Sequence, residues 1–482
     1  MIEDPVVPQT PENEKGATAA IQDAGDAPSL AIVNLDIGSD TSPGMYGDMY
    51  SNKFSDSAIY CHMAPAGGTG PPYYWLYFLA EGAANVVFSI HPATAVDART
   101  PGTLVLIQDA GGRPVDLRGH VLRVSKDNKN TRSGAEIKRD YEILIRPLFE
   151  DDDDGYDFAS HLPELDPIQL DSLVIVDLNR QVSKQIYRQQ IGTIPTNMGR
   201  MNNMALLMAD MSSVPQEAFS IEIKPKWLSQ SPNAIPNALR CRTCALQASK
   251  GGAPSDYICP LQLGLGARKI IEPWLKRKVR KTIEIEEFAL EPPPGVEQKI
   301  VEHLTTYLAA GGEGHELLKH LRHLQTKHDP KGVLSCDEAT VRRADRLTKR
   351  YQEQHDHDEL TSPRISDLRS TLRTTEGNQP GKSDDDFTDQ EIDAFTKIHN
   401  LQHAMTLRDC SLFIKVNYNS GDITVESKLG DLDFKSKAKL EDWREKEEDL
   451  ISGGWYKGFG TFQKSEPCLL TASWRANIPW YW

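Results

Sequence analysis

Apolar residues occur in short runs through the first half of the chain, and these runs have the length of β-strands. Residues 75–90 contain two runs on either side of Gly82, which predicts a strand, a glycine turn and a second strand. Residues 120–126 alternate apolar and polar side chains, as a half-buried strand does. Further strands are predicted at 142–149, 173–178 and 205–208.

Strands and helices are mixed in the second half. A strand is predicted at 219–226, where Pro225 ends it because proline has no N–H group to donate to a neighbouring strand. A turn at 419–421 joins two more predicted strands, which are 410–416 and 423–427.

Helices are predicted where apolar residues recur every three or four positions. One such segment is 296–308, and a second follows the Gly311-Gly312 break. Thr388 and Glu391 form a capping box, which predicts the start of a helix over 389–405.

This order of elements predicts an α+β protein with two lobes and a cleft between them. Residues 1–72 are expected to form a disordered or irregular N-terminal arm, 73–215 the first lobe, and 216–482 the second. A polar stretch of low complexity at 353–387 predicts a disordered insert in the second lobe.

The chain has a formal net charge of −15, so no nucleic-acid partner is expected, because binding along DNA or RNA needs a basic face. A small polyanion remains possible, since a cleft can be basic while the remaining surface is acidic. No membrane partner is expected, because no apolar run reaches the roughly 18 residues that a spanning helix needs. Residues 1–16 are acidic and do not form a secretory signal. The seven scattered cysteines do not form a disulfide framework, so we expect reduced thiols inside the cell, in the nucleus or the cytoplasm. A monomer is the default expectation.

The sequence EIKPK places three charged residues on one face of a strand: Glu222, Lys224 and Lys226. A face with one carboxylate and two ammonium groups does not pack against an apolar core. It is therefore either the exposed face of an edge strand or one wall of a cleft that binds a polyphosphate.

Carboxylates suited to proton transfer and metal binding occur near the last predicted strands. Asp409 precedes the strand 410–416, where it could act as a general base or bind Mg²⁺. Asp431 and Asp433 share one face of an extended segment, and lysines follow them at 435, 437 and 439. Acids for a metal beside bases for phosphates are what phosphoryl transfer requires.

Other motifs are less specific. Gly381-Lys382-Ser383 ends like a Walker A loop, but Glu376 stands where its first glycine belongs. The small-residue turn at 81–85 is either a plain hairpin turn or a place where main-chain N–H groups approach a phosphate. Cys241 and Cys244 have the spacing of half a zinc site, but a second pair is missing from the sequence around them.

Together these motifs resemble the inositol-pentakisphosphate 2-kinase family. The more specific ones are EIKPKW at 222–227 and MTLRDCSLFIKV at 405–416. Supporting motifs occur in the order of the family: EGAANVVF (81–88), VLRVSK (121–126), ALLMAD (205–210), RCRTC (240–244), ICPLQL (258–263) and DLDFKSKAK (431–439). The resemblance covers roughly residues 73–456, and the inserts look like those of fungal members.

The resemblance implies a fold distantly similar to protein kinases, with ATP bound between two lobes. The axial 2-hydroxyl of inositol 1,3,4,5,6-pentakisphosphate would attack the γ-phosphate of ATP. Asp409 would be the catalytic base, and Lys224 would stabilise the transferring phosphoryl group. Asp431 and Asp433 would hold Mg²⁺.

The resemblance also implies the groups that contact the two substrates. ATP would be contacted by Gly82, Ala83, Asn85, Arg123, Asp210 and Glu222. The phosphates of the inositol would be bound by Lys184, Lys226, Arg240, Lys435 and Lys439.

The chain departs from the family pattern at several positions. Plant members carry zinc ligands in a later segment, and these have no counterpart here, so no zinc is expected. Cys244 and Ala245 stand where the family often has His-Gln. One arginine that binds substrate in the family has no clear counterpart after Cys259.

A basic segment at 276–281 has three possible roles: nuclear import, phosphate binding or a solvated helix face. Two functions other than a kinase also remain. One is a scaffold that binds inositol phosphates, which would not need Asp409 and Asp431. The other is a nucleic-acid adaptor using residues 268–281, which the net charge of −15 disfavours.

Overall fold

The computed structural model describes residues 58–65, 68–69, 72–82, 84–93, 102–126, 132–150, 156–189, 204–254, 256–285, 292–293, 295–355, 388–419, 422–458 and 468–471. All of these belong to one unit that begins at Phe54. The predicted arm up to residue 57, and the predicted insert from 356 to 387, lie outside the described residues.

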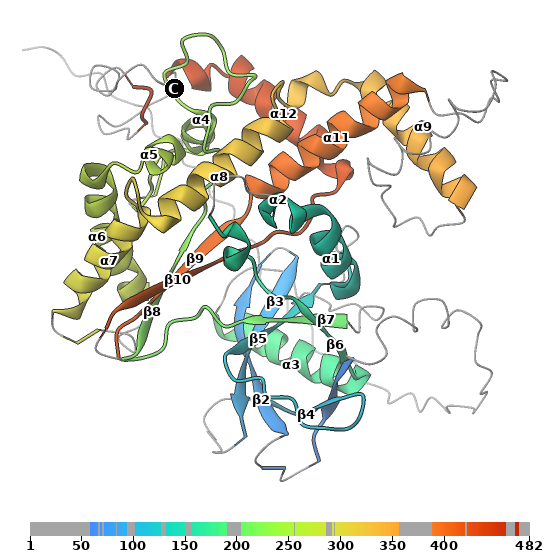
Figure 1. Ribbon diagram of the computed structural model, residues 1–482, viewed down its shortest axis with the longest axis vertical. Helices are drawn as coiled ribbons and strands as arrows, with labels where there is room; N and C mark the ends of the chain where they lie inside the picture. Colours follow the sequence, from blue (N-terminus) through green and yellow to red (C-terminus); the bar gives the residue numbers. More distant parts are fainter. Residues whose placement is uncertain are drawn as a thin grey trace, which may run out of the picture. The chain divides into compact units, whose positions relative to one another are not determined.

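Seven strands form a closed barrel in the order β1-β4-β2-β3-β5-β7-β6 (Figure 1). Their bounds are β1 Ile59–Met63, β2 Tyr73–Glu81, β3 Asn85–Pro92, β4 Thr103–Asp109, β5 His120–Ser125, β6 Asp166–Leu170 and β7 Met204–Ala209. Neighbouring strands are antiparallel except β1 and β6, whose parallel pairing closes the barrel. Alternate side chains such as Leu76, Phe88 and Val105 fill its interior.

The strands predicted at 75–90, 120–126 and 205–208 are confirmed as β2, β3, β5 and β7. The irregular arm predicted up to residue 72 is wrong at β1, a strand of five residues. Only Cys61 in this strand is fully buried, so its own apolar pattern is weak. Its pairing partners, β4 and β6, lie far along the chain, and local sequence does not reveal them.

Two other predicted strands are helical. Residues 173–178 lie in α3, Ser172–Gln189, which packs on β1, β2 and β4. Val174 and Leu178 face the barrel from one side of the helix, while Val176 is 55% exposed. Residues 142–149 form a π-helical turn, Tyr141–Ile145, followed by α2, Pro147–Glu150. A short apolar run is compatible with either a strand or a buried helix. In both segments, packing against the rest of the fold favours the helix.

The second sheet has three antiparallel strands in the order β10-β9-β8. β8 is Ala218–Ile223, β9 is Ser411–Asn417 and β10 is Thr424–Gly430. The hairpin predicted from the last two strands is confirmed, while residues 420 and 421 of its turn lie outside the described residues. β8 ends at Ile223, earlier than predicted, so Lys224 and Lys226 lie beyond the strand.

Helices lie on one side of this sheet and beyond one end of it (Figure 1). They are α4 Arg242–Ser249, α5 Pro260–Leu265, α6 Arg268–Ile285, α7 Val296–Leu308, α8 Glu313–His328, α9 Glu338–His355, α11 Asp389–Leu407 and α12 Leu440–Ser452. The predicted helices α7, α8 and α11 are confirmed, and both hydrogen bonds of the capping box at Thr388 and Glu391 are present. α7 packs on β9 and β10, which covers one face of the sheet.

A segment from the middle of the barrel sequence packs with this second sheet. It contains α1, Gly134–Asp140, and continues to Leu165 between β5 and β6. Ile137, Tyr141 and Phe149 join the apolar core formed by β8, β9, α7 and α8. Residues of the predicted first lobe, 73–215, therefore pack in the apolar core that contains β8 and β9.

The fold is therefore of the α+β class, with a barrel and a helix-covered sheet. None of the helices in the described ranges is both long and apolar enough to cross a membrane. The chain passes from β7 to β8 through Asp210, whose N–H donates to Gly119 O at 2.8 Å. Lys415 of β9 donates to Asp210 O at 3.0 Å, which ties this connection to the second sheet.

Candidate active site

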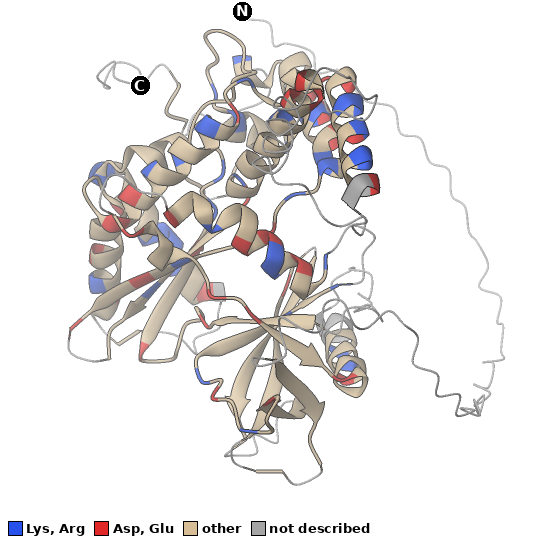
Figure 2. Cartoon of the chain, turned by 45° about the vertical axis from the view of Figure 1, so that its right-hand side comes forward, with Lys and Arg blue, Asp and Glu red and all other residues tan. Residues whose placement is uncertain are grey.

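An open cavity of about 640 Å³ lies at the end of β8, between α4, α6, α12 and the start of β9. Nine basic and four acidic residues line it. The basic ones are Lys224, Lys226, Arg242, Lys250, Lys278, Arg408, Lys435, Lys439 and Lys446. Basic and acidic residues are interspersed along the helices (Figure 2), and the whole chain has a net charge of −15. The excess of bases in this cavity is therefore local, as a site for a polyanion requires.

Lys224 is held by three oxygen-bearing side chains. Its ammonium Nζ lies 3.1 Å from Glu222 Oε1 and 3.1 Å from Asp431 Oδ2, and it donates to Ser411 Oγ at 2.9 Å. Ser411 in turn donates to Glu222 Oε1 at 2.6 Å. Partial burial lowers the pKa of Lys224, but the two carboxylates outweigh it and raise the pKa. Lys224 is therefore a fixed positive charge at neutral pH.

Asp409 lies between two lysines. Lys226 Nζ donates to its Oδ1 at 2.9 Å, and Lys435 Nζ lies 2.8 Å from its Oδ2. Burial raises the pKa of Asp409, but the two ammonium groups outweigh burial and hold the pKa well below its usual value. Asp409 is therefore ionised, and half of its side chain is exposed to the cavity.

Two of these charged residues have unusual backbone conformations. Lys226 has φ of +55° and Asp431 has φ of +54°, both in the left-handed region that favours glycine. Each such conformation costs about 1–3 kcal/mol and persists where the surrounding fold determines it. Pro225 fixes the chain just before Lys226, and Asp431 directly follows β10. These backbone conformations bring Lys226 to Asp409, just before β9, and Asp431 to Ser411 on β9.

The barrel contributes a second group of polar residues. Arg123 on β5 forms an ion pair with Asp433, and the Asn85 side-chain oxygen accepts from Arg123 at 2.6 Å when its amide is oriented to satisfy both atoms. Burial raises the pKa of Asp433, but Arg123 outweighs it and keeps the pKa below its usual value. Arg123, Asp431 and Asp433 line a narrow pocket of about 10 Å³.

The turn between β2 and β3 lies beside this group. Gly82 N donates to Asn85 O at 2.9 Å, and Lys126 Nζ forms an ion pair with Glu81 at 2.6 Å. Lys126 is only 5% exposed, so this pair anchors the base of the turn. Ala83 lies outside the described residues.

Comparison with known proteins gives two findings. A family model described as inositol-pentakisphosphate 2-kinase matches residues 78–449, which is more than half of the chain. The chain belongs to the inositol-pentakisphosphate 2-kinase family. It is also similar to an inositol-pentakisphosphate 2-kinase of Yarrowia lipolytica (strain CLIB 122 / E 150), with 25% identity over 405 residues. That match covers 81% of this chain and 95% of the relative.

Membership of the inositol-pentakisphosphate 2-kinase family makes the chain a kinase, and no finding favours the scaffold alternative. The ion-paired groups at Lys224 and at Lys226 contain the two acids that a scaffold would not need, Asp431 and Asp409. Residues of the basic segment 276–281 have different surroundings. Lys276 pairs with Glu272 on the exposed side of α6, whereas Lys278 lines the cavity.

The structure brings several of the predicted site residues together in two groups. Glu222, Lys224 and Asp431 form one group, and Lys226, Asp409 and Lys435 form the other. Residues of both groups line the cavity, as does Lys439. Asp210 lies at the connection between β7 and β8. Lys184 is exposed on α3, and no contact among the described residues joins it to either group.

Arg240 departs from its predicted role. Its side chain is 1% exposed, and it donates to Trp455 O at 3.1 Å, so it does not line the cavity. The neighbouring Arg242 does line it, and pairs with the fully buried Glu447 at 2.8 Å. Of the two arginines, only Arg242 lines the cavity.

Sequence analysis also missed the wall formed by Trp227. The guanidinium of Arg408 lies 3.5 Å from the centre of its ring, and that of Arg242 lies 4.3 Å from it. Such cation–π contacts hold both arginines at the edge of the cavity. The sequence gave one signal for this wall: each of its residues belongs to a motif of the family resemblance. Trp227 ends EIKPKW, Arg242 lies within RCRTC, and Arg408 begins RDCS.

Proposed function

We propose that the chain transfers the γ-phosphoryl group of ATP to the 2-hydroxyl of inositol 1,3,4,5,6-pentakisphosphate, which gives inositol hexakisphosphate and ADP. Membership of the inositol-pentakisphosphate 2-kinase family supports the reaction class. The observation that carries the choice of site is the cavity with nine basic and four acidic lining residues, which include Lys224 and Asp409. A substrate with five phosphate groups needs such an excess of positive charge.

Asp409 is the proposed catalytic base. The 2-hydroxyl oxygen forms a bond to the γ-phosphorus while the bond from that phosphorus to the bridging oxygen of ADP breaks. The hydroxyl proton passes to the Asp409 carboxylate. Because a hydroxyl has a high pKa, this proton moves late, and the orientation of the two reactants contributes most of the rate. The pairs with Lys226 and Lys435 hold the carboxylate in place for that step.

Lys224 is the proposed group that stabilises the transferring phosphoryl oxygens. It lies between Glu222 and Asp431 as a permanent cation, so no reorganisation is needed when charge develops on the phosphoryl group. The substrate phosphates are proposed to bind Lys226, Arg242, Lys435 and Lys439. Arg242 replaces Arg240 in this set.

ATP is proposed to bind between the barrel and the second sheet, which would then act as two lobes of a fold distantly similar to protein kinases. The contacts would come from Gly82, Ala83, Asn85, Arg123, Asp210 and Glu222. Because the pocket at Arg123 has a volume of only about 10 Å³, we infer that the Arg123–Asp433 pair separates when ATP enters.

Asp431 and Asp433 are proposed to hold Mg²⁺. Carboxylate oxygens are the ligands that Mg²⁺ prefers, and half of the Asp431 side chain is exposed. The ion would neutralise charge on the phosphate oxygens of ATP. Arg123 and Lys224 occupy these carboxylates in the described structure, so they hold the two side chains in position for the ion.

The test is to incubate the full-length protein with Mg-ATP and inositol 1,3,4,5,6-pentakisphosphate and to follow the products by phosphorus NMR. Inositol hexakisphosphate, formed together with one equivalent of ADP, is the expected result. ATP hydrolysis without a phosphorylated inositol, or phosphorylation of a different inositol phosphate only, would contradict the proposal.

Replacing Lys224 by methionine is expected to lower kcat by about 10²–10³-fold, because a fixed charge on the transferring group is lost. The KM for the inositol substrate should change little. Steady-state kinetics measure both constants, and Lys446→Met is the control, since Lys446 lines the same cavity but pairs with Asp442 on α12. A higher KM with unchanged kcat would instead make Lys224 a ground-state binding group.

Replacing Lys439 by alanine is expected to raise the KM for inositol pentakisphosphate about fivefold, corresponding to roughly 1 kcal/mol for one exposed ion pair. The effect should shrink as salt is added, because the pair is screened. Lys437→Ala is a matched control, since Lys437 lies in the same short helical turn, Lys437–Lys439, but pairs with Asp345 outside the cavity. Equal effects of the two variants would show that general surface charge, not a phosphate contact, sets the KM.

A further inference from the structure

The two lysines that pair with Asp409 come from different parts of the chain. Lys226 lies just beyond β8, and Lys435 follows β10. Each ammonium group sits at the end of a flexible four-carbon stem, so the side chain alone does not fix its place on the carboxylate. The geometry at Asp409 therefore requires that the main chain of each lysine is held in position.

One side chain that holds the main chain of Lys226 is Gln325, which is fully buried on α8. Its Nε2 donates to Lys226 O at 2.9 Å and to Leu407 O at 3.2 Å, while its Oε1 accepts from Leu228 N at 3.0 Å. Leu407 lies two residues before Asp409. A single amide group therefore connects the segment that carries Lys226 to the segment that carries Asp409.

The backbone conformation of Lys226 makes this contact more important. Its φ of +55° is one that a residue with a side chain keeps only where its surroundings determine it. Among the described residues, no main-chain group is hydrogen-bonded to Lys226 O, so the Gln325 amide is its partner in the fold. Without that amide, the main chain at Lys226 can leave the left-handed region, which would move its ammonium group away from Asp409.

The main chain of Lys435 is held by α11, which ends two residues before Asp409. Gln402 Nε2 donates to Lys435 O at 2.7 Å, and Thr406 Oγ1 accepts from Lys435 N at 3.0 Å. The Thr406 hydroxyl itself donates to Gln402 O at 2.8 Å, which leaves its oxygen to accept from Lys435. Thr406 O also accepts from Asp409 N at 3.1 Å, so Thr406 contacts the main chain of both members of the Asp409–Lys435 pair.

These three anchor residues, Gln325, Gln402 and Thr406, are buried, and none of them lines the cavity. A buried polar group that loses its partner is costly, so their hydrogen bonds resist breaking. Thr305 shows the ordinary role of such a group, since its hydroxyl donates at 2.6 Å to the carbonyl four residues earlier in α7. The anchor residues differ, because their partners are main-chain groups of the two lysines and of the segment that leads to Asp409.

We propose that Gln325, Gln402 and Thr406 are positioning residues for phosphoryl transfer. They fix the main chain of the two lysines, so that both ammonium groups stay on Asp409 and keep its carboxylate oriented toward the hydroxyl that it deprotonates. This inference rests on the proposed function, in which Asp409 is the base. No bond forms or breaks at the anchor residues, and their contribution is the fixed geometry of the reacting groups.

Thr406→Val tests the inference, because valine has nearly the shape of threonine but no hydroxyl group to accept from Lys435 N. The single-turnover rate of hexakisphosphate formation at saturating substrates should fall about 10–100-fold, since small displacements of a reacting group lower rates on that scale. Thr406→Ser keeps the hydroxyl and should stay within about threefold of wild type. Thr305→Val is the matched control: it removes another fully buried hydroxyl, away from Asp409, and should change the rate less than about twofold.

Combining Thr406→Val with Asp409→Asn separates positioning from general damage to the fold. Asparagine cannot take the hydroxyl proton, so the place of the two lysines no longer affects proton transfer. Thr406→Val should therefore lower the rate less than about threefold in the Asp409→Asn protein, and the two substitutions should not be additive. General damage would instead lower the rate by the same factor with and without Asp409.

Because the loss of a buried hydroxyl can prevent folding, a second variant gives the same test. Gln325→Met keeps the length of the side chain and removes its amide, and it should lose rate about 10–100-fold, again only where Asp409 is present. Gln181→Met is its matched control, since Gln181 is also buried and its amide bonds two main-chain groups of β2 in the barrel. That variant should stay within about twofold of wild type.

Thermal melts followed by circular dichroism show which variants are folded at the assay temperature. The proposal is overturned if folded Thr406→Val or Gln325→Met keeps the wild-type rate, if Thr406→Ser is as slow as Thr406→Val, or if a control loses as much. An undiminished loss in the Asp409→Asn protein also overturns it. Wild type that forms no hexakisphosphate would contradict the proposed function and this inference with it, whereas an active wild type with equally active variants contradicts the positioning roles alone.

Discussion

Replacement of Asp409 by asparagine is expected to lower kcat by about 10²–10⁴-fold, the usual contribution of a general base. Asparagine has the same shape and can still accept a hydrogen bond from Lys226 or Lys435, but it cannot take the hydroxyl proton. The fold of the cavity should therefore survive. Phosphorus NMR under single-turnover conditions measures the rate of hexakisphosphate formation directly, without a contribution from product release.

Asp442→Asn is the control for this experiment. Asp442 is another carboxylate in the lining of the same cavity, but it pairs with Lys446 one helical turn away. Its replacement should change kcat less than about twofold. A loss of less than tenfold in Asp409→Asn would rule out Asp409 as the base and leave it a positioning residue for Lys226 and Lys435.

The low pKa of Asp409 has a defined effect on stability. A carboxyl whose pKa is lower in the folded than in the unfolded protein contributes stability at pH values above its unfolded pKa of about 3.9. That contribution is lost only as the pH falls through the lower, folded pKa. At neutral pH, Asp409 is therefore both ionised and stabilised by its two lysines.

Replacement of Asp329 by alanine is expected to lower the free energy of unfolding by about 3–5 kcal/mol. Arg408 forms an ion pair with Asp329 at 2.6 Å, and both residues are buried, with 3% and 5% exposure. Without Asp329, the guanidinium remains buried without its carboxylate. Burial already lowers the pKa of Arg408, so loss of the partner adds to an existing cost. Urea denaturation monitored by circular dichroism measures the change.

The comparison for this variant is Asp345→Ala. Asp345 pairs with Lys437 at the same distance of 2.6 Å, but both side chains are 48% exposed. An exposed pair contributes only about 0–1 kcal/mol, because water and salt screen it. If both variants lose the same stability, burial does not set the strength of these pairs.

Local patterns predicted the parts of the fold that local interactions determine. The capping box at Thr388 and Glu391 was found because its two hydrogen bonds span only three residues. The hairpin of β9 and β10 was found because its strands are joined by a short turn. Strand β1 and the helical residues 173–178 were missed because contacts with distant segments determine them.

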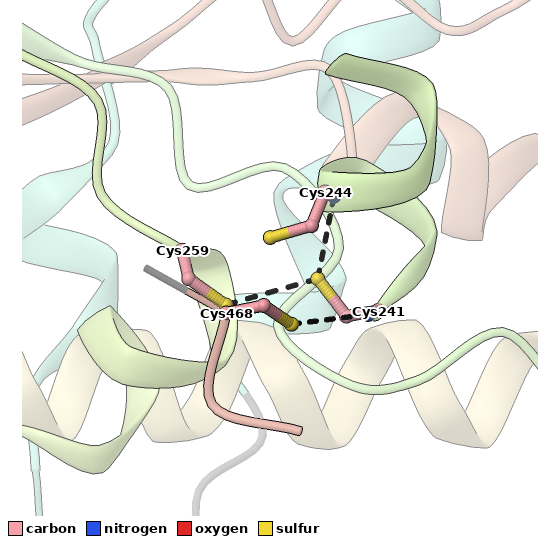
Figure 3. A group of neighbouring side chains, drawn as sticks. All are labelled: Cys241, Cys244, Cys259 and Cys468. Carbon is pink, nitrogen blue, oxygen red and sulfur yellow. Dashed lines mark hydrogen bonds between the residues drawn. The ribbon is translucent and has the colours of Figure 1, made fainter. Parts of the chain in front are cut away.

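The same limit applies to the site. Lys224 and Glu222 were placed together because they are two positions apart in a segment predicted to be extended, and Asp409 was found because it precedes a strand. The wall of Trp227, Arg242 and Arg408 was missed because its members meet only after folding. The approach of Cys468 to Cys241, Cys244 and Cys259 (Figure 3) was missed for the same reason, because spacing along the chain does not show which distant residues meet.

The left-handed conformations of Lys226 and Asp431 also bear on how this protein can be engineered. Glycine would adopt either conformation with less strain, so a screen that rewards thermal stability alone would favour glycine there. Such a variant would relieve the backbone strain but lose the ammonium group that holds Asp409, or the carboxylate that holds Lys224. At these two positions, a more relaxed backbone and a complete set of charges exclude each other.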